Sequence, residues 1–98
     1  MDFEWDQRKY ETNIAKHDID FEDAIYIFEG VVLEKNDPRE YNGETRIIAY
    51  GEVDGRLLVV VYTWRDSARR IISARKANGR EQRAYHATLS SVAPQPDG

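Results

Sequence analysis

The chain has 98 residues, of which 41% are hydrophobic and 33% are charged, and its formal net charge is −4. This length allows one small domain with a single core, and the hydrophobic content excludes a fully disordered chain. The absence of cysteine excludes a disulfide framework, a thiolate metal site and a cysteine nucleophile. The first residues lack the basic and apolar segments of a secretory signal, so we expect a cytoplasmic protein.

Two short helices are predicted in the first third of the chain. Asp6 can accept the free amides at the start of a helix over residues 7–16, and Asp20 can do the same for a helix over residues 21–28. In the second segment apolar residues recur at i, i+3, i+4 and i+7, which is the pattern of an amphipathic helix. Gly30 follows, and we expect it to end this helix in the left-handed conformation.

The middle of the chain predicts a four-stranded antiparallel sheet. Segments rich in β-branched and aromatic residues lie at residues 31–36, 45–53, 57–64 and 69–75. Asp54-Gly55 predicts a tight hairpin turn, because glycine adopts a positive φ at little cost. The unbroken apolar run at 57–64 indicates a central strand covered on both faces, and it is too short to cross a membrane. Phe3 and Trp5 alternate with acidic residues and predict an extended lead-in whose rings pack inward.

A third helix is predicted after the sheet. Asn78 can cap a helix from Gly79 to about Leu89, and we expect residues 90–98, with two prolines, to be a disordered tail. The prediction is therefore a single α+β domain over residues 1–89, with two N-terminal helices, a four-stranded antiparallel sheet and a C-terminal helix.

Positive charge gathers around the last two predicted strands. Between residues 65 and 83 there are two acidic residues and seven basic ones, namely Arg65, Arg69, Arg70, Arg75, Lys76, Arg80 and Arg83. The first 49 residues instead hold 6 basic and 13 acidic groups. This asymmetry indicates an anionic ligand on one face of the domain and a basic partner on another. Simple solvation of edge residues explains the same arginines about equally well.

Several segments carry a resemblance to a known family. They are Phe3-Glu4-Trp5-Asp6, Asn13-Ile14-Ala15-Lys16-His17, Phe21-Glu22-Asp23-Ala24, Leu58-Val59-Val60-Val61-Tyr62-Thr63 and Arg70-Ile71-Ile72-Ser73-Ala74-Arg75-Lys76-Ala77. Together they resemble the BrnT family of bacterial toxins. The resemblance implies a RelE-like fold and a metal-independent ribonuclease that arrests growth. It also implies a BrnA-like antitoxin, a ribbon-helix-helix protein that neutralises the toxin and carries the pair to operator DNA.

Cleavage of RNA without a metal needs a base for the ribose 2′-hydroxyl, positive charge at the phosphate and a proton for the departing 5′-oxygen. No metal site or cofactor is predicted, so these roles fall to Arg, Lys, His, Tyr and Glu side chains. Arginine suits the phosphate because its planar fork binds two oxygens at once. We expect Arg65 and Arg75 to fill this role in a common cleft, with Lys76 next to Arg75 in the chain.

Two residues are candidates for proton transfer. The imidazole of His17 has a reference pKa near ~6.5, which suits that task, although its position at a helix end equally suits a simple cap. Glu52 can exchange protons with Tyr62 if the site is desolvated. A purely structural role is the alternative for both members of this pair.

Other side chains are candidates for RNA binding, namely Lys9, Lys16, Trp64, Arg69, Arg80 and Arg83. For the two lysines on the first helix, the alternative is a solvated surface. Trp64 can stack on an unpaired base beside Arg65. Strand alternation instead places it on the same face as Tyr62, and we favour this core position for its large apolar area.

The sequence leaves two functions open. One is a sequence-tolerant endoribonuclease. The other is a non-catalytic binding subunit of an autoregulatory toxin-antitoxin complex on DNA, whose basic surface is covered by an acidic antitoxin segment. The acidic first half of the chain is unfavourable for RNA, but it suits basic residues of a partner and faster encounter with it.

Overall fold

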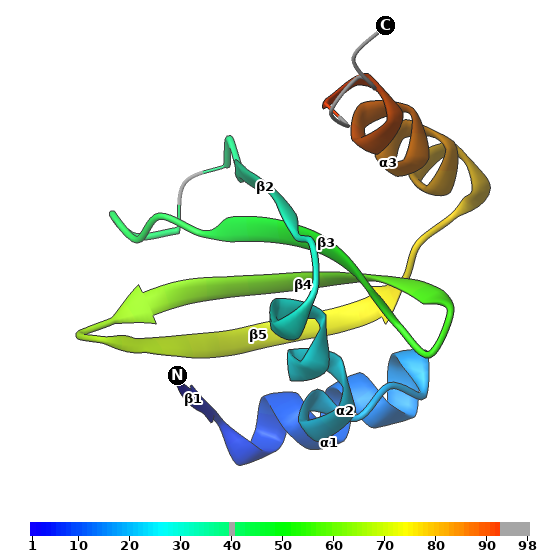
Figure 1. Ribbon diagram of the computed structural model, residues 1–98. Helices are drawn as coiled ribbons and strands as arrows, with labels where there is room; N and C mark the ends of the chain where they lie inside the picture. Colours follow the sequence, from blue (N-terminus) through cyan, green and yellow to red (C-terminus); the bar gives the residue numbers. More distant parts are fainter. Residues whose placement is uncertain (40, 93–98) are drawn as a thin grey trace, which may run out of the picture.

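The computed structural model describes residues 1–39 and 41–92. In chain order its elements are β1 (Asp2–Trp5), α1 (Gln7–His17), α2 (Phe21–Ala24), the 3-10 helix η1 (Ile25–Glu29), β2 (Leu33–Asn36), β3 (Ile47–Val53), β4 (Arg56–Arg65), β5 (Ala68–Lys76) and α3 (Gly79–Val92). Figure 1 shows α1, α2 and η1 near one another, with α3 standing apart at the other end of the chain. Within the described ranges, no helix combines the length and the apolar character needed to cross a bilayer.

The strands form one sheet in the order β1-β5-β4-β3-β2. β1 runs parallel to β5, and the other neighbours are antiparallel. The α+β class is confirmed, but the prediction of four antiparallel strands is wrong because the lead-in is a fifth strand. β1 has four residues, too few for a recognisable period. Its partner lies far along the chain, since Glu4 pairs with Arg70.

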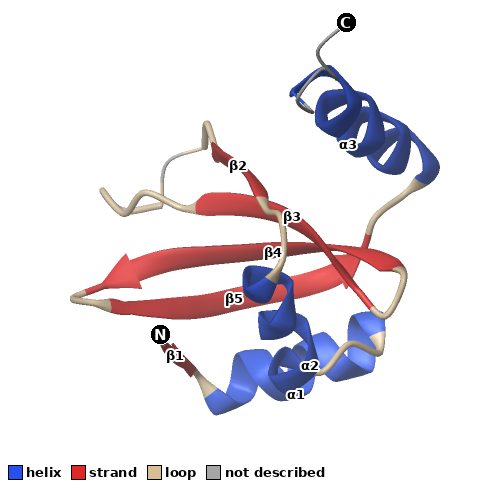
Figure 2. Cartoon of the chain, viewed as in Figure 1, coloured by secondary structure: helices blue, strands red, loops and turns tan. Residues whose placement is uncertain are grey.

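The central strand β4 is buried on both faces, as predicted. Leu58 and Tyr62 belong to the larger core cluster, which packs with α2 and η1, whereas Leu57 and Val59 belong to a smaller cluster with Tyr85 of α3. We call the side of the sheet that carries Leu57 and Val59 the open face. α1, α2 and η1 lie on the other side, and α3 packs against one end of the open face (Figure 2).

The two predicted N-caps are confirmed. The Asp6 carboxylate accepts the backbone amides of Arg8 and Lys9, at 2.8 and 3.2 Å. Asp20 accepts the amide of Glu22 at 2.8 Å. Each cap satisfies amides that the first helical turn leaves without an internal partner.

The second helix differs from the prediction at its end. The α-helix stops at Ala24 and continues as the tighter 3-10 helix η1. Gly30 is extended, with φ −114° and ψ −157°, so the prediction of a left-handed glycine is wrong. η1 packs closely on β3, where a Cβ at Gly51 would lie only 2.7 Å from the Cβ of Ile27. The glycine that matters for this contact is therefore on the sheet.

The hairpin turn and the last helix agree more closely with the predictions. Asp54 and Gly55 both have positive φ, 51° and 78°, which confirms the predicted tight hairpin turn. α3 begins at Gly79 as predicted and runs to Val92. Three residues of the predicted tail, 90–92, are thus helical, and the rest of that tail, 93–98, lies outside the described residues.

β1 pairs with only the first part of β5, and beyond it the backbone of β5 is hydrogen-bonded to a side chain of α1. Asn13 donates from Nδ2 to the carbonyls of Ile19 and Ala74, at 2.9 and 2.8 Å. Its Oδ1 accepts the amide of Ala74 at 3.0 Å. The buried Asn13 amide thus takes the place of a neighbouring strand and fixes α1 against the sheet.

Candidate active site on the open face of the sheet

Three arginines of β4 and β5 project from the open face. Side chains alternate along a strand, so Arg65 shares the face of Val59 and Thr63. Arg70 lies opposite Thr63 and Arg75 lies opposite Val59, which puts both on that same face. A row of guanidinium groups therefore follows the hairpin on the side that α1 and α2 leave uncovered.

One end of this row carries carboxylates as well as arginines. Glu44 bridges two guanidinium groups, since its Oε1 lies 3.4 Å from Arg46 Nε and its Oε2 lies 3.8 Å from Arg65 Nη2. Glu4 accepts a 2.7 Å hydrogen bond from Arg70. We call these five residues the hairpin-end cluster. The side chain of Arg65 is 52% exposed and that of Glu44 is 33% exposed, so a ligand can reach both.

Backbone contacts hold Glu44 in this position. Its amide donates to the carbonyl of Tyr41 at 2.9 Å across a turn in which Asn42 and Gly43 have positive φ. Thr63 Oγ1 on β4 donates to the carbonyl of Thr45 at 2.8 Å. The segment before β3 is therefore tied directly to the strand that carries Arg65. The sequence predicted a strand over residues 45–53, and neither Glu44 nor Arg46 was singled out as a site residue.

The other end of the row has a different structure. Arg75 donates from both terminal nitrogens to the two carboxylate oxygens of Glu81, each at 2.8 Å. This pair lowers the pKa of Glu81 and raises the pKa of Arg75, chiefly through those hydrogen bonds. Glu81 also accepts the amide of Asn78 at 2.9 Å, while Asn78 Oδ1 accepts the amide of Glu81 at 2.8 Å. The pair and the reciprocal cap together anchor the first turn of α3.

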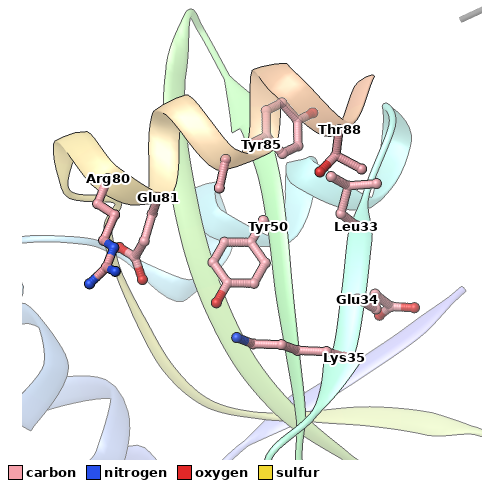
Figure 3. A pocket seen from close by; sticks show the side chains of 9 residues that line it. Leu33, Glu34, Lys35, Tyr50, Arg80, Glu81, Tyr85 and Thr88 are labelled. Carbon is pink, nitrogen blue, oxygen red and sulfur yellow. The ribbon is translucent and has the colours of Figure 1, made fainter. Parts of the chain in front are cut away.

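A cleft of about 530 Å³ opens between α3 and the sheet, beside this anchor. Figure 3 shows the Tyr50 ring below α3, the Lys35 side chain running across below that ring, and Tyr85 above both on the helix. The Lys35 amine lies 5.7 Å from the centre of the Tyr50 ring. The Tyr85 hydroxyl donates to the carbonyl of Val31 at 2.9 Å and ties the middle of α3 to the segment before β2.

Comparison with protein families identifies the chain. A family model described as ribonuclease toxin, BrnT, of type II toxin-antitoxin system matches residues 5–81. The chain belongs to the BrnT family. It is therefore a ribonuclease toxin, with RNA as its substrate and an antitoxin as its partner. A search of curated proteins found no match.

The two arginines predicted to share a cleft in this BrnT toxin do not do so. Arg65 is the last residue of β4, whereas Arg75 pairs with Val59, six residues earlier in that strand. This separation is roughly 20 Å at the usual rise of a strand. The prediction of a common cleft for Arg65 and Arg75 is wrong, because the spacing of residues on the two strands puts them at opposite ends of the hairpin.

The predicted residues on α1 do come together. Lys9, Lys16 and His17 line one groove of about 290 Å³, along with Arg8 and Ser73. Among the residues that the structure describes, none of these basic groups has a carboxylate within 4.0 Å. The BrnT toxin thus presents a cationic groove beside β5, separate from the hairpin-end cluster.

Trp64 and Arg69 lie on the other face of the sheet. The Arg69 guanidinium is 4.5 Å from the ring centres of both Phe28 and Trp64. The Trp64 ring packs edge-on against Tyr62, but the residue is 48% exposed, so the prediction of a core tryptophan is wrong. Strand alternation does place Trp64 on the same face as Tyr62, as predicted. The side chain is exposed because β4 ends at Arg65, beyond the part of this face that the helices cover.

The remaining candidates are scattered. Glu52 lines a hollow together with Asp54 and Arg56, whereas the Tyr62 hydroxyl donates to Glu34, so the predicted Glu52–Tyr62 pair is not formed. Burial is the main cause that raises the pKa of Tyr62. Exposed basic side chains surround the start of α3, namely Lys76, Arg80 and Arg83. Within the described parts of the chain, no three His, Cys, Asp or Glu residues are grouped so that they could hold a metal ion.

Proposed function

We propose that this BrnT toxin cleaves RNA at the hairpin-end cluster without a metal ion. The observation that carries the proposal is the bridging position of Glu44 between Arg46 and Arg65. The Glu44 carboxylate can accept a proton, while the arginines bind the phosphate that receives the attack. The accessible side chains of this cluster meet both needs in one place.

In the proposed reaction, Glu44 removes the proton from the ribose 2′-hydroxyl. The 2′-oxygen attacks the neighbouring phosphorus, a 2′,3′-cyclic phosphate forms, and the bond to the 5′-oxygen breaks. Arg65 stabilises the charge that builds up on the phosphate oxygens, and Arg46 and Arg70 extend this positive surface. The departing 5′-oxygen takes its proton from water, which reaches the exposed side chain of Arg65.

The decisive experiment compares single variants in the presence of EDTA. We expect Arg65→Ala to lower the rate of RNA cleavage about a hundredfold, because one donor to the developing charge is lost. Glu44→Gln removes the base without changing the shape of the side chain and should cause a similar loss. Arg56→Ala is the matched control, since Arg56 is exposed at the opposite end of β4.

Two results would overturn this mechanism. One is cleavage that stops when EDTA is added to the wild-type protein. The other is wild-type activity in both Arg65→Ala and Glu44→Gln. Cleavage products that end in a 2′,3′-cyclic phosphate, detected by mass spectrometry, would support attack by the 2′-hydroxyl.

The proposal extends to the partner. A BrnA-like ribbon-helix-helix antitoxin would neutralise the toxin in the cytoplasm, and the pair would bind operator DNA through the antitoxin. Membership in the family supports this assignment. Gel-shift assays with operator DNA test it, and binding by the toxin alone would contradict it.

A further inference from the structure

The sheet has an open edge at β2. This strand is last in the sheet order, and it pairs on one side with β3. Along its other side, no described strand takes up its backbone groups. Glu34, Lys35 and Asn36 are exposed there. An unpaired edge of this kind is a template for an added strand from another chain.

The α3 cleft lies directly beside this edge and is largely apolar. Leu33 and Lys35 of β2 line it together with Tyr50, Ala84 and Tyr85. Figure 3 shows Leu33 on β2 facing the Tyr85 end of α3, with Thr88 between them. A segment paired along β2 would therefore place alternate side chains between the strand and the helix.

The charged residues of the α3 cleft indicate what kind of segment can bind in it. Glu81 is paired with Arg75, and Glu34 pairs with Ala49 in the sheet, lies on the other face and accepts the Tyr62 hydroxyl. Lys35 and Arg80 make no ion pair with any carboxylate among residues 1–39 and 41–92. Within the described residues, Lys35 and Arg80 thus place positive charge that no direct ion pair neutralises beside an apolar wall.

We propose that the antitoxin adds an extended, acidic segment to the free edge of β2. Its apolar side chains enter the α3 cleft, and its carboxylates lie near Lys35 and Arg80. The family supplies the partner, since a type II toxin has an antitoxin, and the charge of the cleft selects the acidic chemistry. This proposal rests on that partner and not on which residues cleave RNA.

The position of β2 connects this surface with the hairpin-end cluster. Leu33 pairs with Tyr50 next to the cleft, and Asn36 pairs with Ile47, the residue that follows Arg46. A strand bound along β2 therefore leads from the cleft toward the cluster. Its continuation can place a carboxylate on the arginines that we propose bind the RNA phosphate.

The test uses full-length toxin and the separately purified antitoxin of its own operon, with no RNA present. Lys35→Glu and Ala84→Asp each place a negative charge on an exposed residue of the cleft. We expect each to weaken antitoxin binding about tenfold in a calorimetric titration, because like charges then face each other. Arg56→Glu and Ala87→Asp are the matched controls, since these exposed residues lie outside the cleft.

Hydrogen exchange provides a second measurement. The amides of residues 33–36 should gain protection when the antitoxin binds. Protection elsewhere with no change in β2, or cleft variants that bind as tightly as their controls, would overturn the proposal. So would a second copy of the toxin as the occupant, seen as a wild-type dimer that Ala84→Asp dissociates. Loss of RNA cleavage in Arg65→Ala is measured separately and leaves these outcomes unaffected.

Discussion

The two long helices, α1 and α3, are attached to the sheet in contrasting ways. α1 is joined to β5 by the three buried hydrogen bonds of Asn13 and adds Tyr10 to the larger core cluster. α3 is joined by a partly exposed ion pair at its first turn and by Tyr85, with Leu89, against the smaller cluster. The first attachment is buried, whereas the second combines the buried packing of Tyr85 with an ion pair that water reaches.

This difference indicates that the attachment of α1 mainly stabilises the fold, whereas the attachment of α3 mainly concerns binding. Breaking a buried network leaves unpaired groups in the core, whereas breaking an exposed pair lets water take its place. The helix with the weaker attachment forms one wall of the proposed antitoxin cleft, and such surfaces commonly come from the less stable parts of a fold. Substitutions at the two attachments should therefore differ in how much stability they remove and in which parts of the chain they affect.

The largest effect is expected for Asn13→Ala. It leaves the amide and carbonyl of Ala74 and the carbonyl of Ile19 without a side-chain partner in a buried place. We expect a loss of about 3 kcal/mol in the free energy of unfolding, measured by urea denaturation. Thr12→Ala, at the exposed neighbouring position, should change it by less than about 0.5 kcal/mol. Equal effects for the two variants would contradict the buried attachment of α1.

A smaller effect is expected for Glu81→Ala at the start of α3. The substitution removes both the partner of Arg75 and one half of the reciprocal cap with Asn78. Because the pair is partly exposed, we expect a loss of about 1.5 kcal/mol, most of it from the cap. Hydrogen exchange should become faster across α3 and remain unchanged in α1. Faster exchange in both helices would show that the two attachments are not independent.

The contrast also explains what the sequence could and could not predict. Asp6, Asp20 and the Asp54-Gly55 turn act on neighbouring residues, so their roles were visible in the sequence. The side chain of Asn13 bonds to Ala74, which lies 61 residues further along the chain, and no local sequence pattern predicts such a contact. The fifth strand was missed for the same reason, because its pairing is long-range.

The candidate site was only partly predictable. Local charge singled out Arg65 and Arg75, and strand alternation does place both on the open face. Their separation depends on which residues pair across the hairpin, and a register shift at Val61 and Tyr62 alters that pairing. Glu44 was missed because its place in the candidate site depends on a contact with Arg65 of β4, which the local sequence does not reveal.

A third variant, Tyr85→Phe, sharpens the description of α3. It removes the hydroxyl that donates to the carbonyl of Val31 and keeps the ring in the smaller cluster. We expect a loss of about 1 kcal/mol in the free energy of unfolding, the usual value of one hydrogen bond. His86→Ala, at the exposed next position, is the control. No change in Tyr85→Phe would mean that packing alone holds the middle of the helix.

The smallest effect is a pH dependence confined to α3. Arg75 lowers the pKa of Glu81 below its ordinary value of 4.5, so folding favours the ionised carboxylate. The stabilisation is complete above pH 4.5 and is lost as the pH falls through the lowered pKa of the folded state.

Glu81→Gln lacks this titration. The difference in hydrogen exchange of α3 between wild type and Glu81→Gln should therefore shrink as the pH falls below 4.5. The attachment at Asn13 contains no titrating side chain, so the same comparison in α1 should show no pH dependence. A difference in α3 that is constant with pH would mean that ionisation of Glu81 contributes no stability to this helix.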